Sequence, residues 1–337
     1  MRRAASLEGE SQVAARRVVK SYRLGLDEYD LAIIAQLEED GRRGPSEIAE
    51  ALGIHRNTVR VKLNRLIDKR AITPAVYVDP RILGYRAPAI IGIKVVPSEI
   101  DKVATRVATL PNIHHVFVCL GRYDIVLGGS LFRDEDELLS FVTNEVGKTP
   151  GVIDVETMIT VGLSKITFAV VDAQQSQRPK NVQLREAVDT SLDEDDSAII
   201  RELQRDARQS AFALAATLGM NRNSVAAKLR HLLDQGIVRA VAVADPSMMG
   251  YQVMAIFGIS VLPGQIDVVS ERLRRVRNLQ TSVSCIGRYN IMVWCLCRNL
   301  EELYTTLTTD LASIPGLRDV EAMLILRTKK TSLDYLQ

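Results

Sequence analysis

The stretch GRYD, residues 121–124, carries side chains that suit the binding of an amino acid. Glycine lets the backbone approach a ligand closely. Arg122 can hold a carboxylate through a two-pronged hydrogen bond, and Asp124 can accept hydrogen bonds from an ammonium group. The alternative is an ordinary β-turn, in which Tyr123 packs and Asp124 accepts from nearby backbone N–H groups. The residue types alone leave both interpretations open.

The same turn returns 166 residues later as GRYN, residues 287–290, and an apolar run follows it each time. The repeat extends far beyond the turn, because residues 26–85 and 192–251 are identical at 24 of 60 positions without a gap. The offset becomes 165 between PGVIDVE and PGLRDVE, so one residue was lost in between. The chain is therefore a tandem duplication of a unit of about 150 residues, here called unit 1 and unit 2.

A second group of side chains suits contact with DNA. The stretch His55–Arg70 predicts a helix that carries six basic residues and only one acid, Asp68. The end of such a helix enters the major groove in helix-turn-helix proteins, where arginine reads guanine and asparagine reads adenine. The alternative is a solvated basic face. We predict that the first recognition helix contacts DNA through Arg56, Asn57, Thr58, Arg60, Lys62 and Arg65.

The corresponding helix of unit 2, residues 221–236, is less basic, and Ala226 and Ala227 replace Arg60 and Val61. Fewer basic groups mean fewer phosphate contacts. The sequence leaves open whether this helix binds DNA less tightly, reads other bases or serves only in packing. The residues predicted to contact DNA here are Arg222, Asn223, Ser224 and Lys228.

Two kinds of element must position these residues. In unit 1, Asp27 or Asp30 can cap a first helix, Pro45 suits the start of a second, and Gly53 ends it before the third. This order is that of a helix-turn-helix domain, and the residues after it, 71–80, predict a short β wing or a connector. The second half of each unit predicts the order βαββαβ of a ferredoxin-like domain.

We therefore predict an α+β protein with two winged helix-turn-helix domains and two ferredoxin-like βαββαβ domains in tandem. The predicted ranges are a basic arm at 1–25, helix-turn-helix domains at 26–80 and 192–246, βαββαβ domains at 85–171 and 251–330, and a polar linker at 172–191 with a short helix around 184–188.

Composition narrows the class of protein. A net charge of +2 over 337 residues gives no global basic field, so any DNA contact must be local. No apolar stretch is long enough to span a bilayer, and the N-terminal residues do not resemble a signal peptide, so we expect a cytoplasmic protein without membrane contact. Cys295 and Cys297 alternate on a predicted strand without a further ligand at a familiar spacing, which favours buried thiols over a metal site. His114 and His115 have no positioned catalytic partner in the sequence.

The order and spacing of LDEYDLAIIAQLEED, LGIHRNTVRVKLNRL, VDPRILGY, GRYD and PGVIDVETMIT resemble the Lrp/AsnC family of transcriptional regulators, and the pattern occurs twice. The resemblance implies a DNA-binding regulator without a catalytic site or cofactor. Its βαββαβ domain (the RAM domain) is expected to bind a small effector, often an amino acid, and to pair with other subunits.

The resemblance also implies which residues face the effector. Gly121, Arg122, Tyr123 and Asp124 would form the effector-side turn of unit 1, with Thr157 nearby. Gly287, Arg288, Tyr289 and Asn290 would form it in unit 2, with Ala322 in place of Thr157. Because unit 2 lacks one negative charge and one hydroxyl group, we predict that its pocket differs from that of unit 1 or is empty.

The family pattern is one unit per chain, so this fused pair departs from it. The two units are expected to form an internal pseudo-dimer with their sheets packed face to face, whose unequal recognition helices suit a non-palindromic operator. Larger homo-oligomers through the βαββαβ domains are the family expectation.

Two other functions are compatible with this architecture. Sirohaem decarboxylases resemble the same pair of units, but their Thr-His-Asn-Tyr stretch before the turn is missing from IHHVFVCLGRYD. An effector sensor that has lost DNA binding is the other alternative, and the basic first recognition helix argues against it.

Overall fold

The computed structural model describes residues 25–168, 170–171 and 192–336. The predicted basic arm, apart from Gly25, and the predicted linker with its short helix lie outside the described residues.

The first helix-turn-helix domain forms as its sequence predicts. Asp27 and Asp30 close a reciprocal capping box at the start of the first helix, Pro45 begins the second, and Gly53 ends it with a left-handed φ of 64°. The elements are α2 (Glu28–Glu39), α3 (Pro45–Leu52), α4 (Arg56–Asp68) and β1 (Ile72–Val78).

The second helix-turn-helix domain repeats this construction. Asp193 and Asp196 form the same capping box, Ser210 caps the second helix, and Gly219 ends it with a φ of 66°. The elements are α8 (Glu194–Arg205), α9 (Ala211–Leu218), α10 (Arg222–Asp234) and β6 (Val238–Ala244).

The strand after each recognition helix joins the two domains instead of forming a wing within one of them. β1 and β6 pair antiparallel with each other, from Ile72 opposite Ala244 to Val78 opposite Val238. Arg42 donates to the carbonyls of Ala207 and Gln209 at 2.8 and 2.7 Å. Its counterpart, Arg208, donates back to the carbonyls of Gly41 and Arg43 at 3.1 and 3.4 Å. The two domains are therefore fixed to each other by a two-stranded ribbon and a reciprocal arginine exchange.

Each unit continues into a βαββαβ domain, as predicted. In unit 1 the elements are β2 (Ala89–Val95), η2 (Pro97–Glu99), α5 (Ile100–Ala108), β3 (Ile113–Leu120), β4 (Ile125–Ser130), α6 (Glu135–Ser140), η3 (Phe141–Val146) and β5 (Val152–Ile166). In unit 2 they are β7 (Val253–Val261), α11 (Ile266–Leu273), β8 (Leu279–Ile286), β9 (Ile291–Cys297), α12 (Leu300–Thr305), η4 (Thr306–Leu311) and β10 (Leu317–Thr331).

The residue missing from unit 2 corresponds to a bulge in β4. Ile91 lies opposite Leu127, but Ala89 lies opposite Ser130, so β4 holds one extra residue there. Gly129, inside this bulge, has a φ of 56°, a conformation that favours glycine.

The two βαββαβ domains share one sheet. The strand order is β10-β3-β4-β2-β5-β8-β9-β7, and β10 pairs with β3 to close a barrel. Each closing strand changes partner along its length: β5 pairs first with β2 of its own unit and, from Ile159 on, with β8 of the other. β10 pairs likewise with β7 and then, from Leu324 on, with β3.

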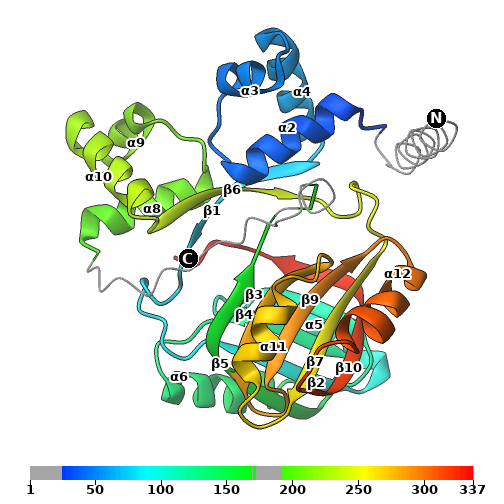
Figure 1. Ribbon diagram of the computed structural model, residues 1–337. Helices are drawn as coiled ribbons and strands as arrows, with labels where there is room; N and C mark the ends of the chain where they lie inside the picture. The colour runs from blue at the N-terminus through cyan, green and yellow to red at the C-terminus, as the bar shows by residue number, and fades with distance from the viewer. Residues whose placement is uncertain (1–24, 169, 172–191, 337) are drawn as a thin grey trace, which may run out of the picture.

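The inner faces of the two halves of this sheet pack against each other inside the barrel. Tyr123 and Tyr289 lie here among buried apolar residues from both units. Each tyrosine ring covers a glycine, since a Cβ added to Gly92 would lie 2.6 Å from the ring of Tyr123, and one added to Gly258 would lie 2.5 Å from that of Tyr289. Helices α5, α6, α11 and α12 cover the outside of the barrel (Figure 1).

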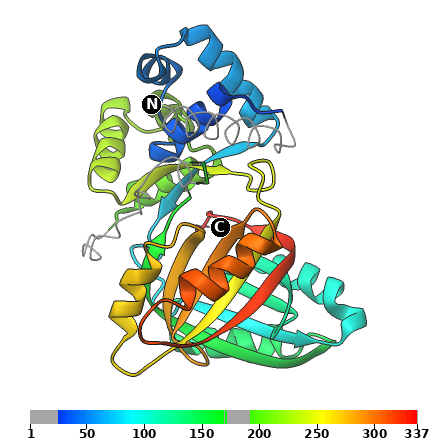
Figure 2. The same ribbon diagram turned by 45° about the vertical axis from the view of Figure 1, so that its right-hand side comes forward.

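The molecule has two layers: the joined helix-turn-helix domains lie above, and the barrel lies below (Figures 1 and 2). Among the described residues, no helix has the length and apolar character needed to cross a membrane.

The contact of tyrosine with glycine leads to a prediction. Gly92→Ala and Gly258→Ala should each lower the free energy of unfolding by about 1–3 kcal/mol, because the added methyl group overpacks the barrel. Urea unfolding measures this. Gly162→Ala is the matched control, since its Cβ would meet only the Ser284 side chain at an ordinary 3.8 Å. Equal stability of all three variants would contradict the packing argument.

Candidate nucleic-acid interface and effector site

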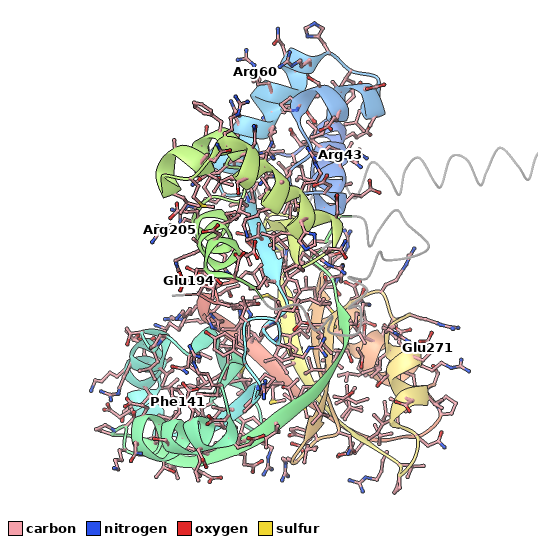
Figure 3. The ribbon with its side chains drawn as sticks, turned by 90° about the vertical axis from the view of Figure 1, so that its left-hand side faces the viewer. Arg43, Arg60, Phe141, Glu194, Arg205 and Glu271 are labelled. Atoms are coloured by element: carbon pink, nitrogen blue, oxygen red, sulfur yellow. The ribbon has the colours of Figure 1, made fainter. Side chains whose placement is uncertain are left out.

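The first recognition helix presents its N-terminal turn to solvent. His55 caps it, with Nδ1 accepting from the Asn57 backbone N–H at 3.2 Å. Val59, Leu63 and Leu66 are buried, and Arg60 lies on the opposite, exposed side. The exposed residues of this face include Arg56, Asn57, Thr58 and Arg60. Figure 3 shows Arg60 at the outer end of the helix-turn-helix layer, far from Phe141 on the barrel.

Two basic residues predicted to contact DNA have another role in this structure. Lys62 donates to Asp27 at 2.5 Å and to Asp30 at 3.1 Å, and Arg65 donates to Asp30 at 2.5 Å. Asp30 is fully buried, and the Lys62 side chain is 16% exposed. Burial alone would lower the pKa of Lys62, but the hydrogen bonds from its ammonium group to Asp27 and Asp30 raise that pKa overall. Both residues therefore tie α4 to the capping box of α2.

The second recognition helix follows the same plan with other details. Asn221 caps it by accepting from Asn223 N–H at 2.9 Å and Ser224 N–H at 3.3 Å. Asn223 and Ser224 are exposed, and the Arg222 guanidinium lies 5.5 Å from the ring centre of exposed Phe212. Lys228, like Lys62, is tied to the first helix of its domain, at 2.5 Å from Asp193 and 3.1 Å from Asp196.

In the first GRY turn, residues 121–124, Asp124 supports the end of β2. Its carboxylate accepts from Val95 N–H at 2.9 Å and from the Lys94 ammonium at 3.3 Å. In the second GRY turn, residues 287–290, Asn290 accepts from Val261 N–H at 2.8 Å, and Ser260 stands where unit 1 has Lys94. The lost negative charge at Asn290 is thus matched by the loss of a positive charge beside it. The β-turn alternative describes the contacts of Asp124, and an ammonium ligand at Asp124 stays a prediction.

The arginines and tyrosines of both turns face glutamates on the closing strands. Arg122 and the Tyr123 hydroxyl both donate to Glu156 at 2.6 Å, and Tyr289 donates to Glu321 at 2.7 Å. These hydrogen bonds raise the pKa of Arg122; for Tyr123, burial is the larger cause of a raised pKa, and the bond to Glu156 adds to it. For Glu156, burial works in the raising direction, but the donors Arg122 and Tyr123 lower its pKa overall.

Arg288 is held less closely than Arg122. It lies 3.8 Å from Glu156 of unit 1 and 3.6 Å from Glu321 of its own unit. Glu156 therefore faces arginines from both units, and the two GRY turns meet in one charged network.

Each GRY turn lies against the closing strand of the other unit. A Cβ on Gly121 would lie 3.0 Å from the Ala322 carbonyl oxygen, and one on Gly287 would lie 3.0 Å from the Thr157 carbonyl oxygen. Both glycines have positive φ, 146° and 148°, so the close approach needs glycine. The Thr157 backbone therefore lies against the second turn and the Ala322 backbone against the first, a contact between units that the sequence did not predict. Glu156, the residue before Thr157, contacts the first turn, so this closing strand lies beside both turns.

The sequence interpretation missed Glu156, Glu321 and Lys94. A signal for the glutamates was present, because DVE is retained in both PGVIDVE and PGLRDVE. Lys94 gives no such signal, since its partner is revealed only by the fold.

The cysteines are buried free thiols, as predicted, and the sulfur atoms of Cys295 and Cys297 lie 3.5 Å apart. Within the described part of the chain, no group of three or more His, Cys, Asp or Glu side chains could hold a metal ion.

His114 and His115 are packed rather than solvated. The His114 ring lies edge-on to Tyr335 with the ring centres 4.8 Å apart, and His115 stacks on Phe117 at 6.1 Å. Burial lowers the pKa of His114 to about 3 and that of His115 to about 4. Both are neutral at physiological pH.

Comparisons with known proteins agree with this division of the chain. The model of the AsnC-type helix-turn-helix domain matches residues 26–67 and 192–233. The model of the Lrp/AsnC ligand binding domain matches residues 88–169 and 254–334. Together the matches cover more than half of the chain.

Curated relatives correspond to single units. An HTH-type transcriptional regulator of Pyrococcus abyssi is 34% identical over 156 residues, which are 46% of this chain and 98% of that protein. The regulator Ptr1 of Methanocaldococcus jannaschii is 30% identical over 122 residues, 36% of this chain and 82% of that protein. Among solved structures, the siroheme decarboxylase NirDL covers 92% of this chain and 96% of its own, with a TM-score of 0.62 and 19% identity, a likeness of fold.

The buried histidines predict an acid-sensitive stability. Unfolded histidine binds a proton near pH 6.5, and these folded ones do not, so the unfolded state gains protons as the pH falls below 6.5. Between pH 6.5 and 5, each should cost about 2 kcal/mol of unfolding free energy. His115→Gln should remove its share of this loss in urea unfolding at pH 7, 6 and 5. The exposed His231 provides the control His231→Gln, and parallel stability curves for wild type and His115→Gln would contradict the prediction.

Proposed function

Because the chain belongs to the Lrp/AsnC family of transcriptional regulators, we propose that it binds double-stranded DNA as an internal pseudo-dimer, and that a small effector, an amino acid, adjusts this binding. The observation that carries the proposal is the pair of exposed recognition-helix N-termini on one fixed frame. The β1–β6 ribbon and the exchange of Arg42 with Arg208 set the separation of the two helices. Operators are read by two helices at a fixed spacing in dimeric helix-turn-helix proteins.

The internal pseudo-dimer is supported by the sharing of strands. A regulator of this family needs two units to bring two recognition helices together, and here β5 and β10 each complete the sheet of the other unit. We also expect larger assemblies through the βαββαβ domains, with self as the partner.

Binding of an effector at the GRY turns is supported by their position at the junction of both units. The strands that pass these turns continue to the DNA-binding layer: after β5, the N–H groups of Val170 and Val171 donate to Glu38 of α2. After β10, the Leu333 carbonyl accepts from Gln204 of α8 at 3.1 Å. A ligand that shifts either closing strand therefore acts on a strand whose end contacts a helix-turn-helix domain.

The fold likeness to a decarboxylase favours no enzyme activity here. At 19% identity it concerns the backbone, and His114 and His115 pack against Tyr335 and Phe117. The curated relatives are regulators.

If the chain binds DNA as proposed, substitutions of two nearby basic residues, Arg60 and Lys62, should have different effects. Arg60→Ala should weaken DNA binding and reduce the salt slope by about one, because an exposed cation is lost. Lys62→Ala should instead lower the melting temperature, because it leaves the buried Asp30 without one of its partners. Fluorescence anisotropy at several salt concentrations and thermal unfolding measure the two effects. If Arg60→Ala binds DNA like the wild type, the assignment of α4 is wrong.

If an amino acid binds at the GRY turns, the two turns should contribute unequally to its affinity. Arg122→Gln and Arg288→Gln should weaken binding of the stabilising amino acid by different factors, at least one of them about tenfold, since a charged hydrogen bond contributes about 1.5–3 kcal/mol. A thermal-shift screen of amino acids finds the ligand, and calorimetry on the full chain gives the affinities. Lys148→Ala is the control, because the Lys148 ammonium group donates to Asn144 rather than to a residue of either turn. Equal losses in both arginine variants would show that the turns sense alike.

A further inference from the structure

The two recognition helices share their first turn and differ in their second. Along each helix the solvent-facing stripe is set by 3.6 residues per turn. In α4 it carries Arg56, Asn57, Arg60, Val61 and Asn64, opposite buried Val59, Leu63 and Leu66. In α10 the same stripe carries Arg222, Asn223, Ala226, Ala227 and Arg230.

The pair Arg60–Val61 has both groups needed to read a two-base step. Arg60 is exposed and forms no ion pair among the described residues, so its forked guanidinium is available for guanine O6 and N7. Val61 is 63% exposed, so its methyl groups are accessible from outside the domain. An exposed apolar side chain in the major groove packs against a thymine methyl group.

The counterparts in unit 2 have neither group. Ala226 and Ala227 carry a single methyl each and no hydrogen-bond donor. The lysine that ties the recognition helix to the first helix is retained, because Lys62 and Lys228 pair with equivalent aspartates in both units. The change from Arg60 and Val61 to two alanines leaves this tie unchanged.

We propose that Arg60 and Val61 make the operator asymmetric. One half-site requires a guanine next to a thymine at the step they contact, and the other half-site accepts any base there. The chain consequently binds its operator in one orientation. This inference rests on the proposed DNA binding and goes beyond it, because it names the residues that distinguish the half-sites and the bases they read.

Selection from random duplex DNA with the full chain tests the specificity. The wild type should enrich two half-sites that share the bases read by the first turn and differ at one step, with about 5- to 150-fold discrimination per base there. Ala226→Arg with Ala227→Val should enrich two half-sites that both carry the guanine–thymine step. Arg60→Ala with Val61→Ala should enrich two half-sites that both lack it.

The outcomes separate this inference from DNA binding itself. A wild-type motif that is already symmetric, or an unchanged motif in the Ala226→Arg, Ala227→Val variant, would overturn the inference and leave DNA binding intact. Failure of the wild type to enrich any motif would overturn both. The melting temperature of each variant confirms that it folds, which the exposure of positions 60, 61 and 227 favours.

Orientation is tested by directed cleavage. Ser46 is exposed on α3, and the four native cysteines are buried, so Ser46→Cys offers a single accessible thiol for an iron chelate. Cleavage of the selected operator next to the guanine–thymine half-site alone is expected. Equal cleavage at both half-sites would contradict a single orientation.

Discussion

The exchange of closing strands between the units is the interaction on which the rest of the structure depends. β5 and β10 are each 15 residues long, long enough to pair with a strand of their own unit and then with one of the other. A βαββαβ sheet alone would leave edge strands with unpaired backbone groups. The exchange pairs β5 with β8 and β10 with β3, so that the barrel closes and these edges disappear. Neither unit completes its sheet alone.

The same exchange fixes what lies beside each closing strand. Lys165 on β5 is buried and donates to the carbonyls of Arg274 and Val276 at the end of α11 in unit 2. Lys330 on β10 donates to the Leu110 carbonyl after α5 in unit 1. Each lysine thus satisfies backbone acceptors of the other unit at a helix C-terminus, where positive charge is favoured. Burial lowers the pKa of Lys165 to about 8. The two carbonyl groups accept hydrogen bonds from its amino group in this apolar environment.

Much of the fold could be predicted from the sequence, because the elements depend on local periodicity and on caps. The repeat located equivalent helices and strands twice, and both units form the predicted order of elements. The partners across units could not be predicted, since alternation along a strand shows that one face is buried but not which strand lies beside it. The contact of the Thr157 backbone with the second GRY turn follows from that register, so the sequence alone did not predict it.

The candidate site was harder to predict because the basic residues of the first recognition helix have two roles. Some hold the domain together, and others face solvent, where DNA would bind. Lys62 and Arg60 are two residues apart and equally basic, yet the helical step puts them on different flanks, one toward Asp27 and Asp30 and one toward solvent. The sequence alone therefore predicts that both residues contact DNA. The capping box LDEYD was visible in the sequence, but its second use as an acceptor for α4 required the packing of two helices.

The duplication allows structural and functional residues to be separated within one molecule. Some residues that hold the fold are the same in both units, as with Lys62 and Lys228, and others are changed together, as Lys94 with Asp124 becomes Ser260 with Asn290. The joint change to Ser260 and Asn290 preserves the hydrogen bond to the backbone and the local net charge. Arg60 and Val61, both exposed, change to the partly buried Ala226 and the exposed Ala227. This difference is tolerated because Arg60 and Val61 are not part of the core, and it changes a surface that would meet DNA.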